Sequence, residues 1–425
     1  MIPIHLALPA LAVSAALGAG LERALGGSER GDASPWPLRI ACGLALVCAA
    51  LLHPLVSLAL LSIHVARARA GTAGASPPPS SALTIDRGAA VVLVVLGLAI
   101  VVRMPVPIYW DEHVWLAKVR LGPLALREAA LDPAQAVIPR GYPIVASLAQ
   151  SLFAQGRDDL GAITAGAAAL SLLAASNALG ALPARRALGW LATLATMPLV
   201  WIHLRSAYLD AVVGLLALAL ALALPRPTTS ARHGAIATAF LLAGAKDEGL
   251  AHVIAIACAH VLRSDARRRA LGEAAAPLGA GLLAVGSWAA LRAAHGVLGG
   301  DHALDFAGFG QLGAIALELA RAMTDVLSFG LVWPFVLGAV AACSVTEAPR
   351  TRRLALTLTL QSGLLVGGLA LGTEQLVAFT LDGTVAPRLL VQLAPLAAWL
   401  CCEALVELPK RSAQRADHSP IRGAS

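Results

Sequence analysis

Long apolar stretches, rich in Ala, Leu and Val, recur along almost the whole sequence, and short segments between them hold most of its charged residues. A stretch of about 20 apolar residues is long enough to cross the hydrocarbon core of a membrane as a helix. Of the 425 residues, 58% are hydrophobic and only 13% are charged, whereas charged residues make up roughly 25% of a soluble domain. The sequence therefore predicts an all-α, polytopic transmembrane helix bundle and excludes an ordinary soluble domain.

We predict about twelve spans, several of them short for an upright crossing. They lie at 3–20, 38–66, 88–104, 160–183, 187–202, 207–225, 233–245, 249–263, 274–294, 324–343, 354–371 and 388–407. The first span lacks a basic segment before it and is followed directly by the second. We therefore expect it to be retained rather than removed as a signal peptide.

The basic residues fall in alternate connections between these spans. By the positive-inside rule, such connections face the cytoplasm. They contain Arg67, Arg69, Arg185, Arg186, Arg226, Arg232, Arg263, Arg267, Arg268, Arg269, Arg350, Arg352, Arg353, Lys410 and Arg411. The acidic residues gather in the other connections, which we assign to the extracytoplasmic face. The same rule accounts for the net charge of +7, so the charge does not indicate a nucleic-acid partner.

Three parts follow from this arrangement. Residues 1–87 form two leading transmembrane helices and a flexible cytoplasmic linker, 88–408 form the main membrane unit, and 409–425 form a polar cytoplasmic tail that we expect to be disordered. The six cysteines all fall inside apolar spans, without the spacing of a metal site or a disulfide framework. We predict no resident metal from them.

An acidic pair, Asp111-Glu112, stands in the largest extracytoplasmic connection, at about 105–159. Carboxylates in so apolar a chain are costly unless they have partners or a function. On a helix, Asp111, Trp115 and Lys118 share one face because they are spaced by four and three residues. A carboxylate can accept a proton from an attacking hydroxyl, and a cation can stabilise a departing phosphate. We therefore predict Asp111 and Glu112 as the catalytic residues.

The same connection holds other candidate substrate-binding residues: Trp115, Lys118, Arg120, Arg140 and Tyr142. Its apolar part, 144–155, is too short to span a membrane and predicts a helix that lies in the interface or re-enters it. An alternative interpretation is that the tryptophans are interfacial anchors and that Lys118 and Arg120 extend to lipid headgroups.

Three more polar segments are predicted to meet the same membrane face. One joins two spans at 203–210, one lies between spans at 246–248, and one opens the last span. Charges at such junctions are costly unless they are paired or line a wet cavity. Their candidate substrate-binding residues are His203, Arg205, Tyr208, Asp210, Lys246, Asp247, Glu248 and Arg388. The simpler alternatives are a connecting turn at 246–248 and a headgroup anchor at Arg388.

The order of these motifs resembles that of the bacterial GT-C membrane glycosyltransferases, which include protein O-mannosyltransferases and the lipid A aminoarabinose transferase. The resemblance covers roughly residues 88–408. The matching segments are Trp110-Asp-Glu112 with Trp115, Lys118 and Arg120, then Tyr142-Pro143, Ala184-Arg-Arg-Ala187, Tyr208-Leu-Asp210, Lys246-Asp-Glu-Gly249 and Arg388-Leu-Leu-Val-Gln-Leu-Ala-Pro395. Two leading helices precede the part that is similar to the family.

The resemblance implies transfer of a sugar from a polyprenyl-phosphate donor to an acceptor hydroxyl, with inversion, on the extracytoplasmic face of a bacterial inner membrane. It implies that Asp111 is the general base, with Glu112 as the substitute. Lys118, Arg120, Lys246 or Arg388 would stabilise the lipid phosphate. The expected acceptor is a cell-envelope glycan, lipid or protein. No cofactor is expected, although the acidic residues are compatible with a divalent metal.

Other classes of protein stay open at this point. A multi-span transporter or flippase of a lipid-linked or polar substrate would also carry charges in its spans, but near the midplane, with broken helices and often repeated halves. An O-antigen polymerase or ligase shares the lipid-linked donor, but we expect its catalytic loop later in the chain. A membrane scaffold would need no acidic cluster.

Overall fold

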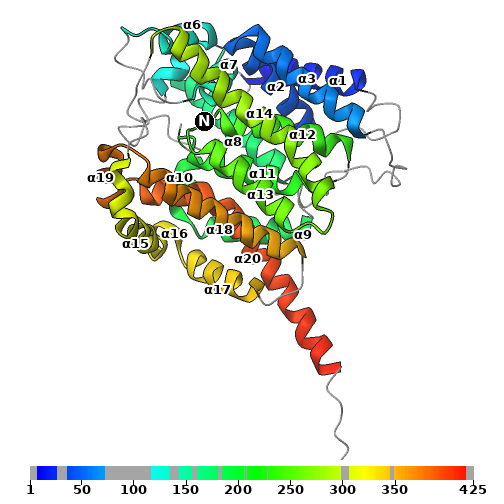
Figure 1. Ribbon diagram of the computed structural model, residues 1–425, viewed down its shortest axis with the longest axis vertical. Helices are drawn as coiled ribbons and strands as arrows, with labels where there is room; N and C mark the ends of the chain where they lie inside the picture. The colour runs from blue at the N-terminus through cyan, green and yellow to red at the C-terminus, as the bar shows by residue number, and fades with distance from the viewer. Residues whose placement is uncertain are drawn as a thin grey trace, which may run out of the picture.

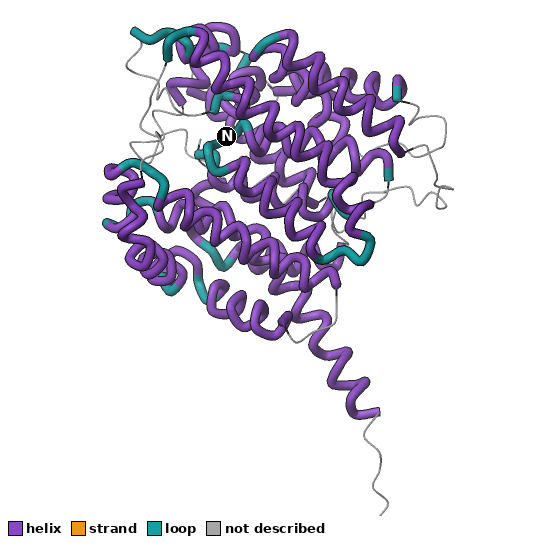
Figure 2. The backbone as a smooth tube through the Cα atoms, viewed as in Figure 1, coloured by secondary structure: helices purple, strands orange, loops and turns teal. Residues whose placement is uncertain are grey.

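The computed structural model describes residues 7–25, 36–71, 116–134, 143–155, 160–179, 184–204, 206, 208–226, 228–297, 306–344 and 349–417. Every element in these ranges is a helix, and they contain no β-strand (Figure 2). The all-α prediction is therefore confirmed for the described residues. The helices are α1 (Leu8–Ala24), α2 (Trp36–Leu52), α3 (Pro54–Gly71), α6 (Pro123–Ala130), α7 (Val145–Phe153), α8 (Leu160–Leu179), α9 (Ala184–Ala195), α10 (Pro198–Leu204), α11 (Asp210–Ala223), α12 (Thr229–Ala243), α13 (Gly249–Leu262), α14 (Arg267–Ala294), η2 (Phe306–Gln311), α15 (Leu312–Met323), α16 (Val326–Phe329), α17 (Val332–Ser344), α18 (Pro349–Ala370), α19 (Glu374–Leu381) and α20 (Ala386–Asp417).

Three of these helices are long and apolar enough to cross a membrane: Arg267–Ala294, Pro349–Ala370 and Ala386–Leu405. A fourth crossing results if the bent pair α9 and α10 counts as one span. Six further apolar helices have between 10 and 17 residues. These lengths and compositions indicate a membrane protein.

The helices lie roughly alongside one another, with α1 to α3 at the top of the view, α11 and α13 in the middle and α15 to α18 below (Figure 1). Two of them form the centre of the bundle. Every residue of α11 is buried, and 89% of the apolar part of α20 is buried, against 33% for α14. Because α11 contacts α8, α12 and α20, it links the upper and lower groups of helices in Figure 1.

Two predicted spans are interrupted by a proline. The predicted span 38–66 is divided at His53, and the predicted span 187–202 is divided before Pro198. A proline disfavours the α conformation of the residue that precedes it, so a helix usually ends there. At the first break the His53 ring accepts a hydrogen bond from the Leu55 amide at 3.2 Å and so caps α3. At the second break α9 and α10 meet at an angle of 99°.

The connection at about 105–159 carries short helices where the structure describes it. Residues 116–120 are helical, and α6 follows after a break at Gly122. The apolar segment predicted at 144–155 forms α7, with nine residues, and α7 packs against α8. The predicted span 88–104 and the acidic pair Asp111-Glu112 lie outside the described residues.

Close approaches between backbones hold the polar end of the bundle together. A Cβ atom at Gly214 would lie 2.5 Å from the carbonyl oxygen of Gln392, so α11 and α20 approach closely one turn after Asp210. A Cβ atom at Gly249 would lie 2.0 Å from the Leu242 oxygen, so only glycine fits the tight turn between α12 and α13. Small residues allow such close contacts between membrane helices.

The last helix extends beyond the bundle. Its final turns project away from the other helices (Figure 1). The sequence predicts a disordered tail at 409–425, whereas α20 is helical up to Asp417. Residues 418–425 lie outside the described part of the chain.

Candidate functional site

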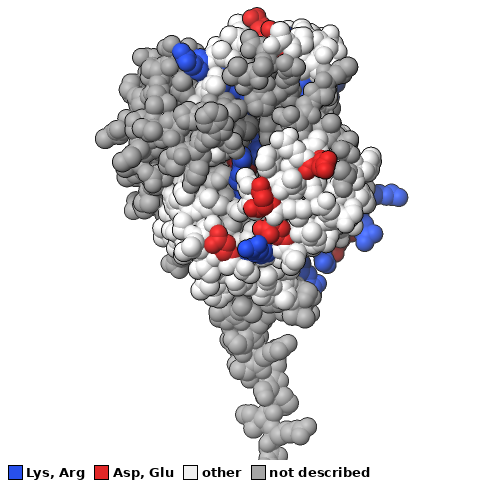
Figure 3. All heavy atoms as spheres, turned by 90° about the vertical axis from the view of Figure 1, so that its left-hand side faces the viewer, with Lys and Arg blue, Asp and Glu red and all other residues white. Residues whose placement is uncertain are grey.

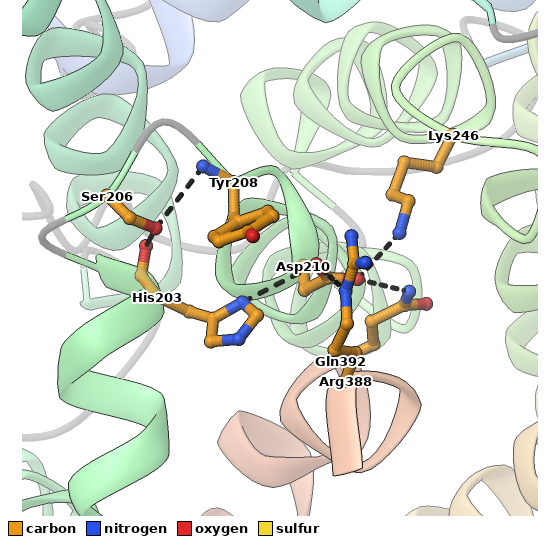
Figure 4. A network of polar contacts seen from close by, with 7 residues as sticks. All are labelled: His203, Ser206, Tyr208, Asp210, Lys246, Arg388 and Gln392. Atoms are coloured by element: carbon orange, nitrogen blue, oxygen red, sulfur yellow. Dashed lines mark hydrogen bonds and ion pairs between the residues drawn. The ribbon is translucent and has the colours of Figure 1, made fainter. Parts of the chain in front are cut away.

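Three connections meet at one end of the bundle and supply its buried charges. Asp210 is the first residue of α11, Lys246 lies in the turn between α12 and α13, and Arg388 lies in the first turn of α20. The start of a helix carries a partial positive charge, which favours a carboxylate such as Asp210 there. Residues far apart in the sequence therefore form one cluster (Figure 4).

The carboxylate of Asp210 is the centre of this cluster. Its side chain is 1% exposed, and its Oδ1 accepts a hydrogen bond from Lys246 Nζ at 2.6 Å. Its Oδ2 lies 3.7 Å from Arg388 Nε. A buried carboxylate without a cation would carry a large desolvation cost, so the two cations keep Asp210 ionised. In return, Asp210 fixes the position of both cations.

A second layer of polar side chains holds Asp210 from α20 and α13. Gln392 Nε2 donates to Asp210 Oδ1 at 2.9 Å, and Gln392 Oε1 lies 3.0 Å from His252 Nε2. Because an amide oxygen only accepts hydrogen bonds, His252 donates from Nε2. Gln392 is 1% exposed and His252 is 0% exposed, so this chain of hydrogen bonds is sealed from water.

The end of α10 and the loop before α11 add two aromatic rings to the site. His203 Nδ1 lies 3.4 Å from Asp210 Oδ2, and its ring stacks on Tyr208 with centroids 4.9 Å apart. The guanidinium of Arg388 lies over the same Tyr208 ring, 4.8 Å from its centroid. Ser206 stabilises the loop, because its hydroxyl donates to the His203 carbonyl at 3.0 Å and accepts from the Tyr208 amide at 3.3 Å. Arg388 is thus held from two sides, by Asp210 and by Tyr208.

A cavity of about 250 Å³ opens beside the cluster. One of its walls is charged, with Lys246, Asp247, Glu248 and Arg388. The rest of its lining is apolar and comes mainly from α18, α19 and the start of α20, with Ala251, Leu364, Leu365, Gly368, Leu369, Leu371, Gly372, Leu376, Val385 and Leu389. Figure 3 shows acidic and basic side chains gathered in and below a recess on this end of the molecule. Asp210 is not among the residues that line the cavity.

Asp247 and Glu248 line the cavity next to Lys246. Asp247 is exposed at the cavity, where neighbouring protein groups displace part of its hydration. This partial desolvation, and then the neighbouring Glu248 carboxylate, raise the pKa of Asp247 to about 7, while Lys246 and Arg292 act in the opposite direction. The Oε2 atom of Glu248 is buried and accepts no hydrogen bond from the described residues. Glu248 can therefore accept a hydrogen bond from a ligand in the cavity.

Lys118, in the connection before α6, approaches the same group of charges. Its side chain is 0% exposed. Burial lowers the pKa of Lys118 to about 7, with a smaller contribution from Lys246. Asp247 acts in the opposite direction. Lys118 is thus close enough to the turn at 246–248 for its charge to interact with those of Lys246 and Asp247.

The structure brings together eight of the candidate residues that the sequence predicts. They are Lys118, His203, Tyr208, Asp210, Lys246, Asp247, Glu248 and Arg388. Arg120, by contrast, is exposed on the surface. The remaining candidates lie outside the described residues: Asp111, Glu112, Trp115, Arg140, Tyr142 and Arg205.

Three residues of the site were not predicted. Gln392 and His252 complete the hydrogen bonds around Asp210, and Arg292, near the end of α14, lowers the pKa of Asp247 in opposition to burial. A signal for Gln392 exists in the sequence, because it follows Arg388 by four residues and therefore shares its helix face. It is also a polar residue in the middle of an apolar span.

The chemistry that this arrangement offers is recognition of an amphipathic anion. Lys246 and Arg388 can neutralise a phosphate, and the leucine wall can hold an apolar chain. Within the described ranges, no group of three or more His, Cys, Asp or Glu side chains is arranged to hold a metal ion. Of the residues that line the cavity, Asp247 and Glu248 supply two carboxylates, fewer than the three ligands of such a group.

Comparison of the chain with protein-family models, curated proteins and solved structures finds no match.

Proposed function

We propose that this protein is an inverting membrane glycosyltransferase with about twelve spans. It would take a sugar from a polyprenyl-phosphate donor and transfer it to an acceptor hydroxyl of a cell-envelope glycan, lipid or protein. The reaction would occur on the extracytoplasmic face of a bacterial inner membrane.

The observation that carries this proposal is the cavity with one charged and one leucine-rich wall. A polyprenyl-phosphate sugar has three chemically different parts: an isoprenoid chain, a phosphate and a polyhydroxylated ring. The leucine wall suits the chain, Lys246 and Arg388 suit the phosphate, and Asp247 with Glu248 suit hydroxyl groups of the sugar. A soluble sugar donor has no apolar chain that could pack against these leucines.

The proposed reaction is a single displacement. The acceptor oxygen attacks the anomeric carbon while the bond between that carbon and the phosphate oxygen breaks. Asp111 takes the proton of the acceptor hydroxyl as general base, with Glu112 as the substitute. The electron pair of the broken bond leaves with the phosphate, which departs as a dianion of the lipid monophosphate. Attack opposite to the leaving group inverts the anomeric centre.

Cations stabilise the charge that grows on the phosphate during this step. Arg388 has the planar fork suited to two phosphate oxygens, and its orientation is set by Asp210 and Tyr208. Lys246 is held by Asp210 at 2.6 Å. Asp210 acts as a positioning residue, because it holds both cations but does not line the cavity.

Mass spectrometry of cell-envelope glycans tests this function. Cells with the wild-type protein should contain a glycan or glycosylated acceptor that is missing both from cells without the protein and from cells with Asp111→Asn. Loss of a general base lowers turnover by roughly 100-fold or more. Glu112→Gln should retain more product than Asp111→Asn. Identical glycan profiles with and without the protein would contradict the proposal.

One observation favours the second candidate, a transporter or flippase of a lipid-linked substrate. The bent pair α9 and α10, at 99°, resembles the broken spans of transporters. Against this, Asp210, Lys246 and Arg388 gather where helices begin or end rather than at their midpoints. The purified protein in vesicles separates the two functions: a transferase forms a glycosylated product with donor and acceptor on one side, whereas a flippase only moves the donor across.

A further inference from the structure

A cluster of arginines lies at the other end of the bundle, far from the cavity. We name it the arginine cluster; it consists of Arg186 and Arg350, which pair with the carboxylate of Glu403, and of Arg226 and Arg353, which lie close to Arg350. Glu403 follows Arg388 on α20 by fifteen residues, which corresponds to roughly 22 Å along a helix. That distance approaches the thickness of a bilayer core, so the cluster lies near the opposite membrane surface. The positive-inside rule assigns this surface to the cytoplasm.

Glu403 holds two of the arginines. Arg186 Nη1 on α9 donates to Glu403 Oε2 at 2.6 Å, and Arg350 Nε on α18 lies 3.4 Å from Oε1. The Glu403 side chain is 3% exposed. The guanidinium of Arg350 also lies 5.6 Å from the centre of the Trp399 ring. Three helices, α9, α18 and α20, are thereby joined at this level.

Two further arginines of the cluster lie close to Arg350. Arg353 follows Arg350 by three residues and so lies on the same face of α18. Its Nε is buried and donates no hydrogen bond. Arg226, which follows α11, is close enough to be affected by the same group: burial, and then Arg350, lower the pKa of its guanidinium. The guanidinium groups of Arg226 and Arg353 thus repel that of Arg350, and an anion beside them would relieve this repulsion.

Apolar side chains surround this charge at the same level of the bundle. Leu188 on α9 is 48% exposed and Leu405 on α20 is 65% exposed. In a membrane protein these side chains face lipid chains. An anion that approaches the arginine cluster from the bilayer is therefore attached to acyl chains, which a free phosphate ion lacks. Basic groups between membrane helices on the cytoplasmic side are suited to anionic headgroups.

We propose that the arginine cluster binds the headgroup of an anionic phospholipid from the cytoplasmic leaflet. The phosphate accepts hydrogen bonds from Arg350 and Arg353 and is attracted by Arg226, while Glu403 holds Arg186 and Arg350 in place. The acyl chains lie beside α9 and α20. This binding is separate from the donor site and does not depend on the proposed glycosyl transfer.

Native mass spectrometry of the purified full chain, titrated with phosphatidylglycerol, tests the proposal. The variant is Arg353→Gln, which leaves both contacts of Glu403 intact. Its matched control is Arg352→Gln, because Arg352 is adjacent in sequence but points about 100° away on the helix. Removal of one arginine near a headgroup should weaken phosphatidylglycerol binding by about fivefold. Arg352→Gln should bind as the wild type does, and phosphatidylcholine should bind weakly to all three proteins.

Three results would overturn the proposal. Arg353→Gln could bind phosphatidylglycerol with wild-type affinity, Arg352→Gln could lose as much affinity as Arg353→Gln, or inorganic phosphate at millimolar concentration could displace the lipid. The second result would mean that only the general positive charge matters, and the third would mean that the cluster recognises phosphate without the lipid. A thermal melting curve of each variant confirms that the compared proteins are folded.

Discussion

The two ends of the bundle each contain a buried carboxylate that holds two cations, yet they differ in what those cations face. Asp210 is 1% exposed and pairs with Lys246 and Arg388. Glu403 is 3% exposed and pairs with Arg186 and Arg350. At the first end, both cations line a cavity of about 250 Å³. At the second end, Arg350 lies against Trp399 instead.

A buried ion pair therefore does not identify a functional site by itself. Both carboxylates join helices that are distant in sequence, and both would be costly to leave without their cations. The feature particular to the first end is a cavity lined both by two carboxylates, Asp247 and Glu248, and by several leucines. This difference predicts that activity depends on the first cluster, and that the second contributes to stability and to lipid binding.

The largest effect is expected at Arg388. Arg388→Ala should lower sugar transfer by about 100-fold or more, because it removes a cation from the charge that develops on the phosphate. Arg388→Lys should retain about a tenth of the activity, since lysine keeps the charge but lacks the fork. The control is Arg321→Ala, whose side chain is 81% exposed on α15. If a folded Arg388→Ala protein transferred sugar at the wild-type rate, Arg388 would be only a headgroup anchor.

A paired substitution compares the two ends directly. Asp210→Asn and Glu403→Gln should each lower the free energy of unfolding by about 3 kcal/mol, because each leaves buried cations without their carboxylate. Transfer per folded molecule should fall strongly for Asp210→Asn and stay near the wild-type rate for Glu403→Gln. Thermal melting and a transfer assay on the same preparations measure both quantities. Equal losses of transfer would mean that the two ends do not differ as we propose.

A smaller effect is expected from pH at Lys118. With its pKa lowered to about 7 by burial, Lys118 is charged below that pH and neutral above it. Donor affinity should therefore fall by up to about tenfold between pH 6 and pH 8, as the charge is lost. Arginine stays protonated throughout this range, so Lys118→Arg should bind the donor with less dependence on pH.

A second group titrates in the same range and must be separated from Lys118. Burial raises the pKa of Asp247 to about 7, so this carboxylate becomes negative as the pH rises and repels a phosphate. Asp247→Asn should remove that part of the pH dependence and leave the part that belongs to Lys118. The double variant Lys118→Arg/Asp247→Asn is then compared with Asp247→Asn alone. If donor affinity depends on pH equally in these two proteins, Lys118 does not contact the donor phosphate.

Labelling of single cysteines tests which side of the membrane each end of the bundle faces. These substitutions are expected to have the smallest effect on the protein. In a Cys258→Ala background, a cysteine at the exposed position Asp382 should react with an impermeant thiol reagent in intact cells. A cysteine at the exposed position Asp265 should react only after lysis. The reverse pattern would place the cavity in the cytoplasm.

The sequence was most informative where polarity interrupts an apolar pattern. Asp210, Lys246 and Arg388 could be predicted because charge at the end of an apolar span is costly without a partner. Their pairing could not be predicted, because it depends on how closely α11 and α20 approach at Gly214. His252 was missed because a single histidine in an apolar helix gives no sign of its partner, Gln392, 140 residues away.

The fold was predictable in class but not in its breaks. Apolar periodicity and length predict helices, and the described residues confirm them. Hydrophobicity alone does not predict the change of direction before Pro198, because the residues on both sides of it are apolar. The bend of 99° there directs α10, which carries His203 near its end, toward the loop that presents Tyr208. A local backbone restriction thus positions part of the site.

Binding of a polyprenyl phosphate to the purified full chain tests the central claim most directly, because it requires neither the sugar nor the acceptor to be known. Polyprenol of the same chain length is the control that lacks only the phosphate. Polyprenyl phosphate should bind at least about tenfold more tightly than polyprenol. Arg388→Ala should abolish this difference, and Arg353→Gln should preserve it. Equal binding of the two lipids, or a preference that Arg353→Gln removes and Arg388→Ala does not, would contradict a phosphate site in this cavity.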